Sequence, residues 1–330
     1  MVIPLFTRRC QNLKDRYGRE IEYVRISITD RCNLKCFYCT NFKNFVPLKH
    51  SDILTYEEIL KLISLLTEFG VKKVRITGGE PLVRRGVGEF LREIKKIPGV
   101  ERLTLTTNGT LLTRYIEDLR EAKVDSVNVS LDSLREDAFA KITGLPKLPM
   151  VVEGIKALKD VGIQVKMNTV YTRLNIDEVE ELVNFALDMD ISLRFIELMP
   201  FGSDWEKYYV PELELMERLK KLGPLEQVEK RLGDGPARYV KLNLGGKELI
   251  VGLIAAMSHK FCDFCNRIRI TADGKLLPCM ASNLSYDLKA ILRKGDEETL
   301  KETIRKAIYN KPLGHNLYKG APNEMRRMGG

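Results

Sequence analysis

Three cysteines lie in one short loop, Cys32, Cys36 and Cys39, directly after an alternating run that ends at Thr29. Their C-x3-C-x2-C spacing can place three thiolates around one metal cluster. An iron–sulfur cubane usually takes four cysteine ligands, so a cluster with three keeps one iron open, and a substrate can bind there. A structural zinc loop or three unrelated thiols are the alternatives, but zinc knuckles favour C-x2-C pairs with a second pair nearby.

A second group of three cysteines follows late in the chain, at Cys262, Cys265 and Cys279. A predicted hairpin at Asp273-Gly274 separates the C-x2-C pair from the third cysteine, which is a strong metal-ligand pattern. A zinc ribbon would need a fourth ligand, and Asp263 or Cys10 could supply it. Two groups of three favour two clusters, each with an open iron, facing each other across a common cavity.

Alternating strand-like and helix-like segments must position the first cysteine loop. The predicted strands are Val24–Thr29, Lys73–Thr77, Arg102–Thr107, Ser126–Leu131, Val165–Tyr171 and Ser192–Leu198. The clearest helix is Thr55–Phe69, with apolar residues at helical spacing and a capping box of Thr55 and Glu58. Six β-then-α units imply parallel strands with right-handed crossovers. We therefore expect an α/β fold, a partial (β/α)6 TIM-like barrel.

The two faces of these strands differ in polarity. One set of alternate residues is apolar and includes Val24 and Val74, and the other is polar and includes Arg25, Arg75 and Lys166. Alternate strand residues face opposite sides, so the apolar set should lie under the helices and the polar set inside. A TIM-type barrel normally has an apolar interior, so this pattern predicts a lumen for a charged ligand. An antiparallel sheet with one wet face is the alternative.

Ligands bind at the carboxyl ends of the strands in such folds. The second strand is followed by Gly78-Gly79-Glu80-Pro81, where two glycines allow a close backbone approach, although most such stretches are only turns. The regular alternation stops after Met199-Pro200. We expect a core over residues 1–224 and a C-terminal α+β extension over 225–330 that carries the second cluster. Terminal glycines such as Gly329-Gly330 are usually disordered.

Composition limits the class of protein. The chain of 330 residues is 44% hydrophobic and 30% charged, and no apolar run approaches the ~18 residues of a membrane helix. Its first residues lack the apolar core of a signal peptide, so we expect a cytoplasmic protein with reduced thiols and no membrane contact. The net charge of +9 comes from scattered residues, which favours a small polyanion over nucleic acid. Three isolated histidines argue against a histidine-based hydrolase.

Together these motifs resemble the GTP 3′,8-cyclase family, radical S-adenosylmethionine (SAM) enzymes that begin molybdenum cofactor biosynthesis. The resemblance extends from Asp15-Arg16-Tyr17-Gly18-Arg19 to Gly329-Gly330, and its most diagnostic part is the run Cys262–Cys279. The chain departs from the family at Thr40-Asn41, where Met-Pro is common.

The resemblance implies a reaction. Reductive cleavage of SAM would give a 5′-deoxyadenosyl radical that abstracts H3′ of GTP. The ribose radical would then attack guanine C8 to give (8S)-3′,8-cyclo-7,8-dihydroguanosine 5′-triphosphate. The implied cofactors are two 4Fe–4S clusters and SAM. The implied partners are a low-potential electron donor and a downstream cyclic pyranopterin monophosphate synthase that receives the product. A homodimer is left open.

The resemblance also implies roles for individual residues. Cys32, Cys36 and Cys39 would hold the cluster that cleaves SAM, and the second cysteine group would hold a cluster whose open iron meets the guanine. The residues implied to contact SAM are Tyr38, Gly79, Ser130 and Met199. Those implied to bind GTP are Arg25, Arg75, Thr106, Lys166, Arg267 and Arg269. Those implied to be needed for catalysis are Arg25, Arg267, Arg269, Gly329 and Gly330.

Two rival functions remain. Another radical SAM enzyme with an auxiliary cluster, such as a peptide-modifying maturase, would typically carry more cysteines in its C-terminal region. A non-enzymatic zinc or iron–sulfur module that binds nucleic acid would show a fourth cysteine per site and a basic stripe, and this sequence has neither.

Overall fold

The computed structural model describes residues 13–39, 45–201, 205–229, 235–317 and 325–329. Sequence features at Cys10, Thr40-Asn41 and Gly330 lie outside these ranges.

Six parallel strands in chain order form the centre of the sheet. They are β1 (Tyr23–Ser27), β2 (Lys73–Thr77), β3 (Arg102–Thr107), β4 (Ser126–Ser130), β5 (Gln164–Tyr171) and β6 (Ser192–Glu197). Each begins within one residue of its predicted start, and each pairs in parallel with its neighbour in the chain. The antiparallel alternative is therefore wrong.

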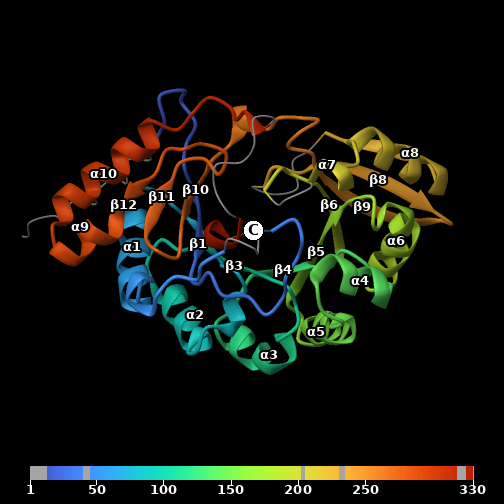
Figure 1. Ribbon diagram of the computed structural model, residues 1–330, viewed down its shortest axis with the longest axis horizontal. Coiled ribbons are helices and arrows are strands. Elements are labelled where there is room, and N and C mark those ends of the chain that lie inside the picture. The colour runs from blue at the N-terminus through green and yellow to red at the C-terminus, as the bar shows by residue number, and fades with distance from the viewer. Residues whose placement is uncertain (1–12, 40–44, 202–204, 230–234, 318–324, 330) are drawn as a thin grey trace, which may run out of the picture.

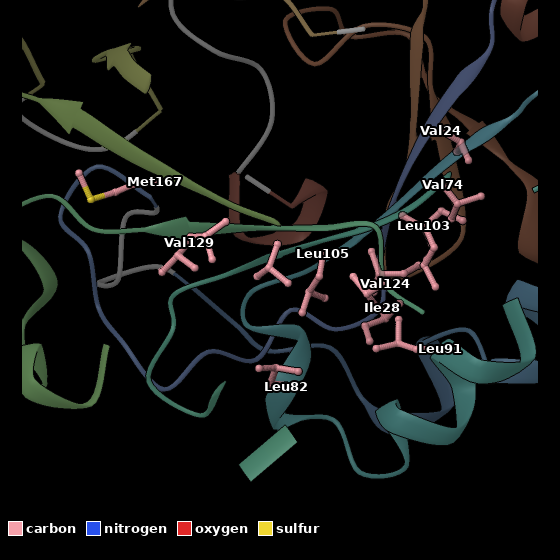
Figure 2. Packing of buried hydrophobic residues seen from close by; sticks show 14 of the residues in the cluster. Val24, Ile28, Val74, Leu82, Leu91, Leu103, Leu105, Val124, Val129 and Met167 are labelled. Atoms are coloured by element: carbon pink, nitrogen blue, oxygen red, sulfur yellow. The ribbon is translucent and has the colours of Figure 1, made fainter. Parts of the chain in front are cut away.

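Helices cover the outer face of this curved sheet (Figure 1). The helices between the strands are α1 (Tyr56–Glu68), α2 (Val87–Lys96), α3 (Leu112–Glu121), α4 (Glu136–Thr143), α5 (Leu148–Asp160) and α6 (Val179–Asp188). The apolar strand residues, including Val24, Val74 and Leu103, are fully buried in one core beneath them (Figure 2). Because strand side chains alternate, the polar set is turned to the inside of the arc, as the sequence predicted.

The C-terminal part of the chain extends both edges of the same sheet, which the sequence did not predict. Its strands are β7 (Leu225–Val228), β8 (Arg238–Leu244), β9 (Lys247–Ile254), β10 (Arg267–Ile270), β11 (Lys275–Leu277) and β12 (Tyr286–Asp287). Strand β9 pairs in parallel with β6, and β10 pairs in parallel with β1, so the described residues form one sheet of twelve strands. The predicted division at residue 224 stays a prediction.

The remaining helices pack at the two edges or enter the arc. They are α7 (Trp205–Tyr208), α8 (Glu212–Leu222), α9 (Leu288–Lys294), α10 (Glu297–Tyr309) and α11 (Met325–Met328). The short α11, red in Figure 1, lies inside the arc of strands and contacts β1. Within the described ranges no helix combines the length and apolar character needed to cross a bilayer.

Helix α1 begins with the capping box that the sequence predicted. The Glu58 backbone N–H donates to Thr55 Oγ1 at 3.2 Å, and the Thr55 backbone N–H donates to Glu58 Oε2 at 2.8 Å. Two backbone donors at the start of the helix thus receive partners.

Replacement of Thr55 tests this cap. Thr55→Ala removes the acceptor for the Glu58 amide, so we expect the free energy of unfolding to fall by about 1 kcal/mol. Thr55→Ser keeps the hydroxyl and serves as the control. Urea unfolding of the cluster-free chain measures both, and equal midpoints for the two variants would contradict the assigned cap.

Candidate functional site

A cavity of about 380 Å³ opens inside the arc of strands. Its volume lies within the range of small-molecule sites. The cationic side chains that line it are Arg25, Lys73, Arg75, Arg102, Lys166, Arg194, Arg267, Arg269 and Lys311. Among the described residues no aspartate or glutamate lines it. The cavity is therefore suited to a polyanion.

Strand register places three of these arginines side by side. Arg25 on β1 lies opposite Arg269 on β10 and opposite Arg75 on β2. Burial, together with the charges of Arg75 and Arg267, lowers the pKa of Arg25 to about 9, although Tyr23 opposes the shift. Burial also holds the pKa of Arg269 well below its usual value, and Arg25 adds to this effect. Like charges opposite each other destabilise a sheet, so this row favours a bound anion.

Tyr23 lies among the same cations. Lys73 Nζ is 4.9 Å from the centre of its ring, and the Arg75 guanidinium carbon is 5.4 Å from it. Burial alone would raise the pKa of Tyr23, but the charges of Arg75 and Arg25 lower it to about 8. The net shift shows that positive charge dominates this part of the cavity.

The second cysteine group lines this cavity. Cys262, Cys265 and Cys279 all face it, beside Arg267 and Arg269. Burial would raise the pKa of Cys265, but the positive charges of Arg267 and Lys311 lower it to about 6. A thiol with this pKa is largely ionised at neutral pH, and the thiolate is the form that ligates metals. The structure thus brings the second group to the cation-lined space.

The first cysteine group lies after β1 and is not among the residues that line the cavity. Burial raises the pKa of Cys36 well above its usual value, and the nearby Asp132, Cys39 and Cys32 add to the shift. The three thiols therefore lie close enough to interact. The loop is fixed on the end of α4, where the Lys35 and Phe37 amides donate to the carbonyls of Thr143 and Ile142.

Both groups fit an iron–sulfur cluster. None of these six cysteines is in a disulfide bond, and each group offers three thiols around one space. Three cysteine thiols form the donor set of a cluster that keeps an open iron. In the described part of the chain no three His, Cys, Asp or Glu side chains are arranged to hold a single metal ion.

The Gly78–Pro81 segment packs against the first cysteine loop. The Gly79 amide donates to the Thr29 carbonyl at 2.6 Å, and a Cβ at Gly79 would collide with the Arg31 carbonyl oxygen. Glu80 is buried and accepts hydrogen bonds from Thr107 Oγ1 at 2.8 Å and from the Asn108 amide at 2.7 Å. The ends of β2 and β3 are thereby joined beside the first group.

Asp132 joins the first loop to the middle of the sheet. Tyr38 donates from its hydroxyl to Asp132 Oδ2 at 2.5 Å, and the Val170 amide donates to Oδ1 at 2.8 Å. Burial raises the pKa of Asp132 to about 6. Tyr38 belongs to the first loop itself, Gly79 follows β2, and Ser130 ends β4 two residues before Asp132. Met199, after β6, lines the cavity instead.

Five of the six residues implied to bind GTP line the cavity, and Thr106 does not. Thr106 lies on β3, where it is buried and its Oγ1 has no hydrogen-bond partner in the described structure. A buried hydroxyl without a partner is costly, and a ligand atom could satisfy it.

The C-terminal segment contacts both cysteine regions. Met325 lines the cavity, while Arg326 donates from Nε to the Asp30 carbonyl at 2.8 Å and from Nη2 to the Cys32 carbonyl at 3.0 Å. Arg269 donates to the carbonyl of Gly329. Gly329 has a φ of +76°, and a Cβ there would collide with Thr77. Gly329 is thus held by Arg269 and lies against Thr77.

Sequence reasoning missed several lining cations, notably Lys73, Arg102 and Arg194. Lys73 belongs to the same alternating set as Arg75, and Arg194 lies in register with Asn168 on β5. Extending the alternation to every residue of every strand would have found both. Arg102 begins β3 in the same alternating set as Thr104 and pairs with Lys73, so the same extension would have found it too.

Two family models match the chain in succession. The Radical SAM superfamily matches residues 26–186, and Molybdenum Cofactor Synthesis C matches residues 191–317. The Radical SAM match contains Cys32, Cys36 and Cys39, and the Molybdenum Cofactor Synthesis C match contains Cys262, Cys265 and Cys279.

Curated relatives match almost the whole chain. A protein named GTP 3′,8-cyclase from Petrotoga mobilis is 44% identical over 311 residues, covering 92% of this chain and 95% of its own. Its namesake from Pelotomaculum thermopropionicum is 44% identical over 327 residues and is covered completely.

Solved structures show the same fold. SuiB of Streptococcus suis bound to S-adenosylmethionine gives a TM-score of 0.63 at 18% identity, covering 89% of this chain and 66% of that one. SuiB bound to its precursor peptide SuiA gives a TM-score of 0.65 at 17% identity. At this identity the likeness concerns the fold alone. The relatives at 44% identity show the family as well as the fold. This chain belongs to the GTP 3′,8-cyclase family of radical SAM enzymes.

Proposed function

We propose that the chain converts GTP into (8S)-3′,8-cyclo-7,8-dihydroguanosine 5′-triphosphate, the first step of molybdenum cofactor biosynthesis. One observation carries this proposal: a single cavity joins a row of buried cations to the second cysteine group. A nucleoside triphosphate has matching parts, a polyanion at one end and a nitrogen base at the other. The names of the relatives at 44% identity support the same substrate.

The chain's own residues bind and orient this substrate. Arg25, Arg75 and Lys166 offer guanidinium forks and an ammonium charge to the triphosphate. Arg267 and Arg269 lie nearer the second cysteine group on β10, and Thr106 offers its buried hydroxyl. A cyclisation within one nucleotide needs its reacting carbons held about 3–3.5 Å apart, so positioning supplies much of the rate.

Cysteines and strand ends would hold the cofactors. Cys32, Cys36 and Cys39 would ligate one 4Fe–4S cluster, and Cys262, Cys265 and Cys279 a second beside the guanine. Tyr38, Gly79, Ser130 and Met199 would contact SAM. When bound, the first cluster and SAM supply the radical that removes the ribose hydrogen. The protein keeps water away from it, and the burial of Cys36 and Tyr38 is consistent with that task.

Gly329 and Gly330 would contribute by holding neighbouring residues in place. Gly329 touches both Thr77, at the end of β2, and Arg269. The tail thereby links the SAM region to the GTP cations, although the cavity itself reaches only the second cysteine group.

Partners and location follow from this chemistry. A low-potential donor must supply the electron, and the product would pass to a cyclic pyranopterin monophosphate synthase. Homodimer formation stays a proposal as well. A cytoplasmic location is supported by six free thiols, since cluster ligands must stay reduced. The SuiB likeness does not favour a peptide substrate, because it lies below the identity at which substrate can be inferred.

The reaction itself is tested by anaerobic incubation of the chain with GTP, SAM and a reductant. We expect a cyclised nucleotide and 5′-deoxyadenosine by mass analysis. Cys36→Ala should abolish both products, while Cys265→Ala should lose the cyclised nucleotide yet still cleave SAM. Wild-type amounts of deoxyadenosine from Cys36→Ala would refute the assigned ligand.

Arg267 is expected to contribute directly to GTP affinity. Arg267→Ala removes a charged donor worth about 1.5–3 kcal/mol, so the dissociation constant should rise about tenfold or more. Arg135→Ala is the control, because Arg135 is exposed and pairs with Asp177 and Glu181 away from the cavity. Anaerobic calorimetry measures both, and an unchanged affinity in Arg267→Ala would count against the site.

We expect turnover to require that residue 329 has no side chain. Gly329→Ala places a methyl group against Thr77 at a positive φ, so the tail should leave its place and turnover should fall at least tenfold. Gly295→Ala is the matched control, because Gly295 has a φ of +75° but no atom within 4 Å of an added Cβ. Turnover that falls equally in both variants would point to backbone strain alone.

A further inference from the structure

We propose that Arg19 and Lys311 are positioning residues for the second cysteine group. They clamp the two backbone segments that carry its cysteines and place a buried positive charge beside the thiols. Arg19 belongs to the Asp15–Arg19 segment and Lys311 follows α10, and neither has a role in the function proposed above.

The Arg19 guanidinium forms hydrogen bonds to three separate segments of the chain. Its Nη1 donates to the Cys262 carbonyl at 2.7 Å and to the Leu313 carbonyl at 3.0 Å, and Nη2 donates to the Pro312 carbonyl at 2.7 Å. Its Nε donates to Asp15 Oδ2 at 2.5 Å. A planar fork with five donors can join such distant segments only in a fixed orientation. Residue 19 is therefore tied at once to residue 262 and to residues 312–313.

Asp15 sets that orientation. Its Oδ1 accepts the backbone amides of Tyr17 at 2.9 Å and Arg19 at 3.0 Å, and Gly18 turns the chain with a φ of +81°. The Asp15 side chain is fully buried, and that of Arg19 is 7% exposed. The pair is thus a rigid local unit, and its outward-facing nitrogens are directed at the second cysteine loop.

Lys311 completes the clamp from the other side. It is one of the largest fully buried side chains, and its Nζ donates to the Arg267 carbonyl at 2.8 Å and the Pro278 carbonyl at 2.6 Å. Buried lysines are rare unless they are paired. Both of these acceptors are neutral carbonyls, and the Lys311 charge acts on the thiols of Cys262 and Cys265.

The contacts of the two residues reach every cysteine of the group. Arg19 holds the carbonyl of Cys262 itself, and Lys311 holds the carbonyls two residues after Cys265 and one residue before Cys279. Residues 311–313 therefore act as a brace between two strand-borne segments and the N-terminal turn. A cluster with only three protein ligands depends strongly on such backbone restraint, and within the described ranges no fourth cysteine limits the spread of the other three.

The charge of Lys311 has a separate consequence. Reduction of a cluster adds an electron, which a neighbouring cation stabilises, so net charge near a cluster sets its potential. The two functions of the clamp can therefore be compared by substitution. Loss of Arg19 should affect mainly cluster retention, whereas loss of Lys311 should affect both retention and the potential.

The test uses the full chain with Cys32, Cys36 and Cys39 replaced by serine, so that only the second group can hold iron. The paired substitution Asp15→Asn with Arg19→Gln avoids a stranded buried carboxylate. We expect it to lose at least half of the reconstituted iron and sulfide. Lys311→Met fills the same space but loses both hydrogen bonds and the charge, so we expect it to retain less iron than the parent chain, and the retained cluster to show a more negative midpoint potential. Arg84→Gln is the control, because Arg84 donates to the Ile28 and Leu54 carbonyls, away from this group.

A second measurement separates positioning from general stability. Hydrogen exchange of the iron-free chain should show faster exchange over residues 262–267 and 276–280 in the paired variant, with unchanged exchange in β3 and β4. Full iron with an unchanged potential in both variants would overturn the proposal. So would an equal loss of iron from the first group in a chain that lacks the second. None of these readouts involves GTP, so they are independent of the cyclase activity.

Discussion

The repulsion between arginines on neighbouring strands is the constraint on which this molecule depends. Parallel register places Arg269, Arg25 and Arg75 next to one another inside the barrel. Unit charges a few ångströms apart repel by about 1 to 4 kcal/mol, depending on how far water is excluded. The strands tolerate this because their opposite faces bury a continuous apolar core under the helices. The residues that stabilise the fold and those that attract the substrate thus alternate along the same strands.

Pairing of β10 with β1 places this row beside the second cysteine group. Residues 267–270 bring that group to the edge of the six central strands, beside the strand that leads into the first group. Helix α11 lines the cavity through Met325 and bonds to the first cysteine loop through Arg326. The two cysteine groups are therefore connected through shared elements, although the cavity is lined by only one of them.

Much of this arrangement could be predicted from local sequence. The six central strands, the cap of α1, the hairpin at Asp273-Gly274 and the inward set of Arg25, Arg75 and Lys166 all follow from alternation or turn chemistry. The pairing of β9 and β10 with the barrel edges could not, because it joins residues far apart in the chain and leaves no local pattern. The roles of Arg19, Lys311 and Arg326 were hidden for the same reason. Each acts by donating to backbone carbonyls, which carry no sequence signature.

The contact between β1 and β10 joins residues near 25 to residues near 268. One edge of the first strand therefore stays without its neighbour until most of the chain has been synthesised. Closing so long a loop costs entropy and slows folding, and an uncovered strand edge invites association with other chains. The nascent protein thus exposes this edge to other chains until residues 267–270 have emerged and paired with β1.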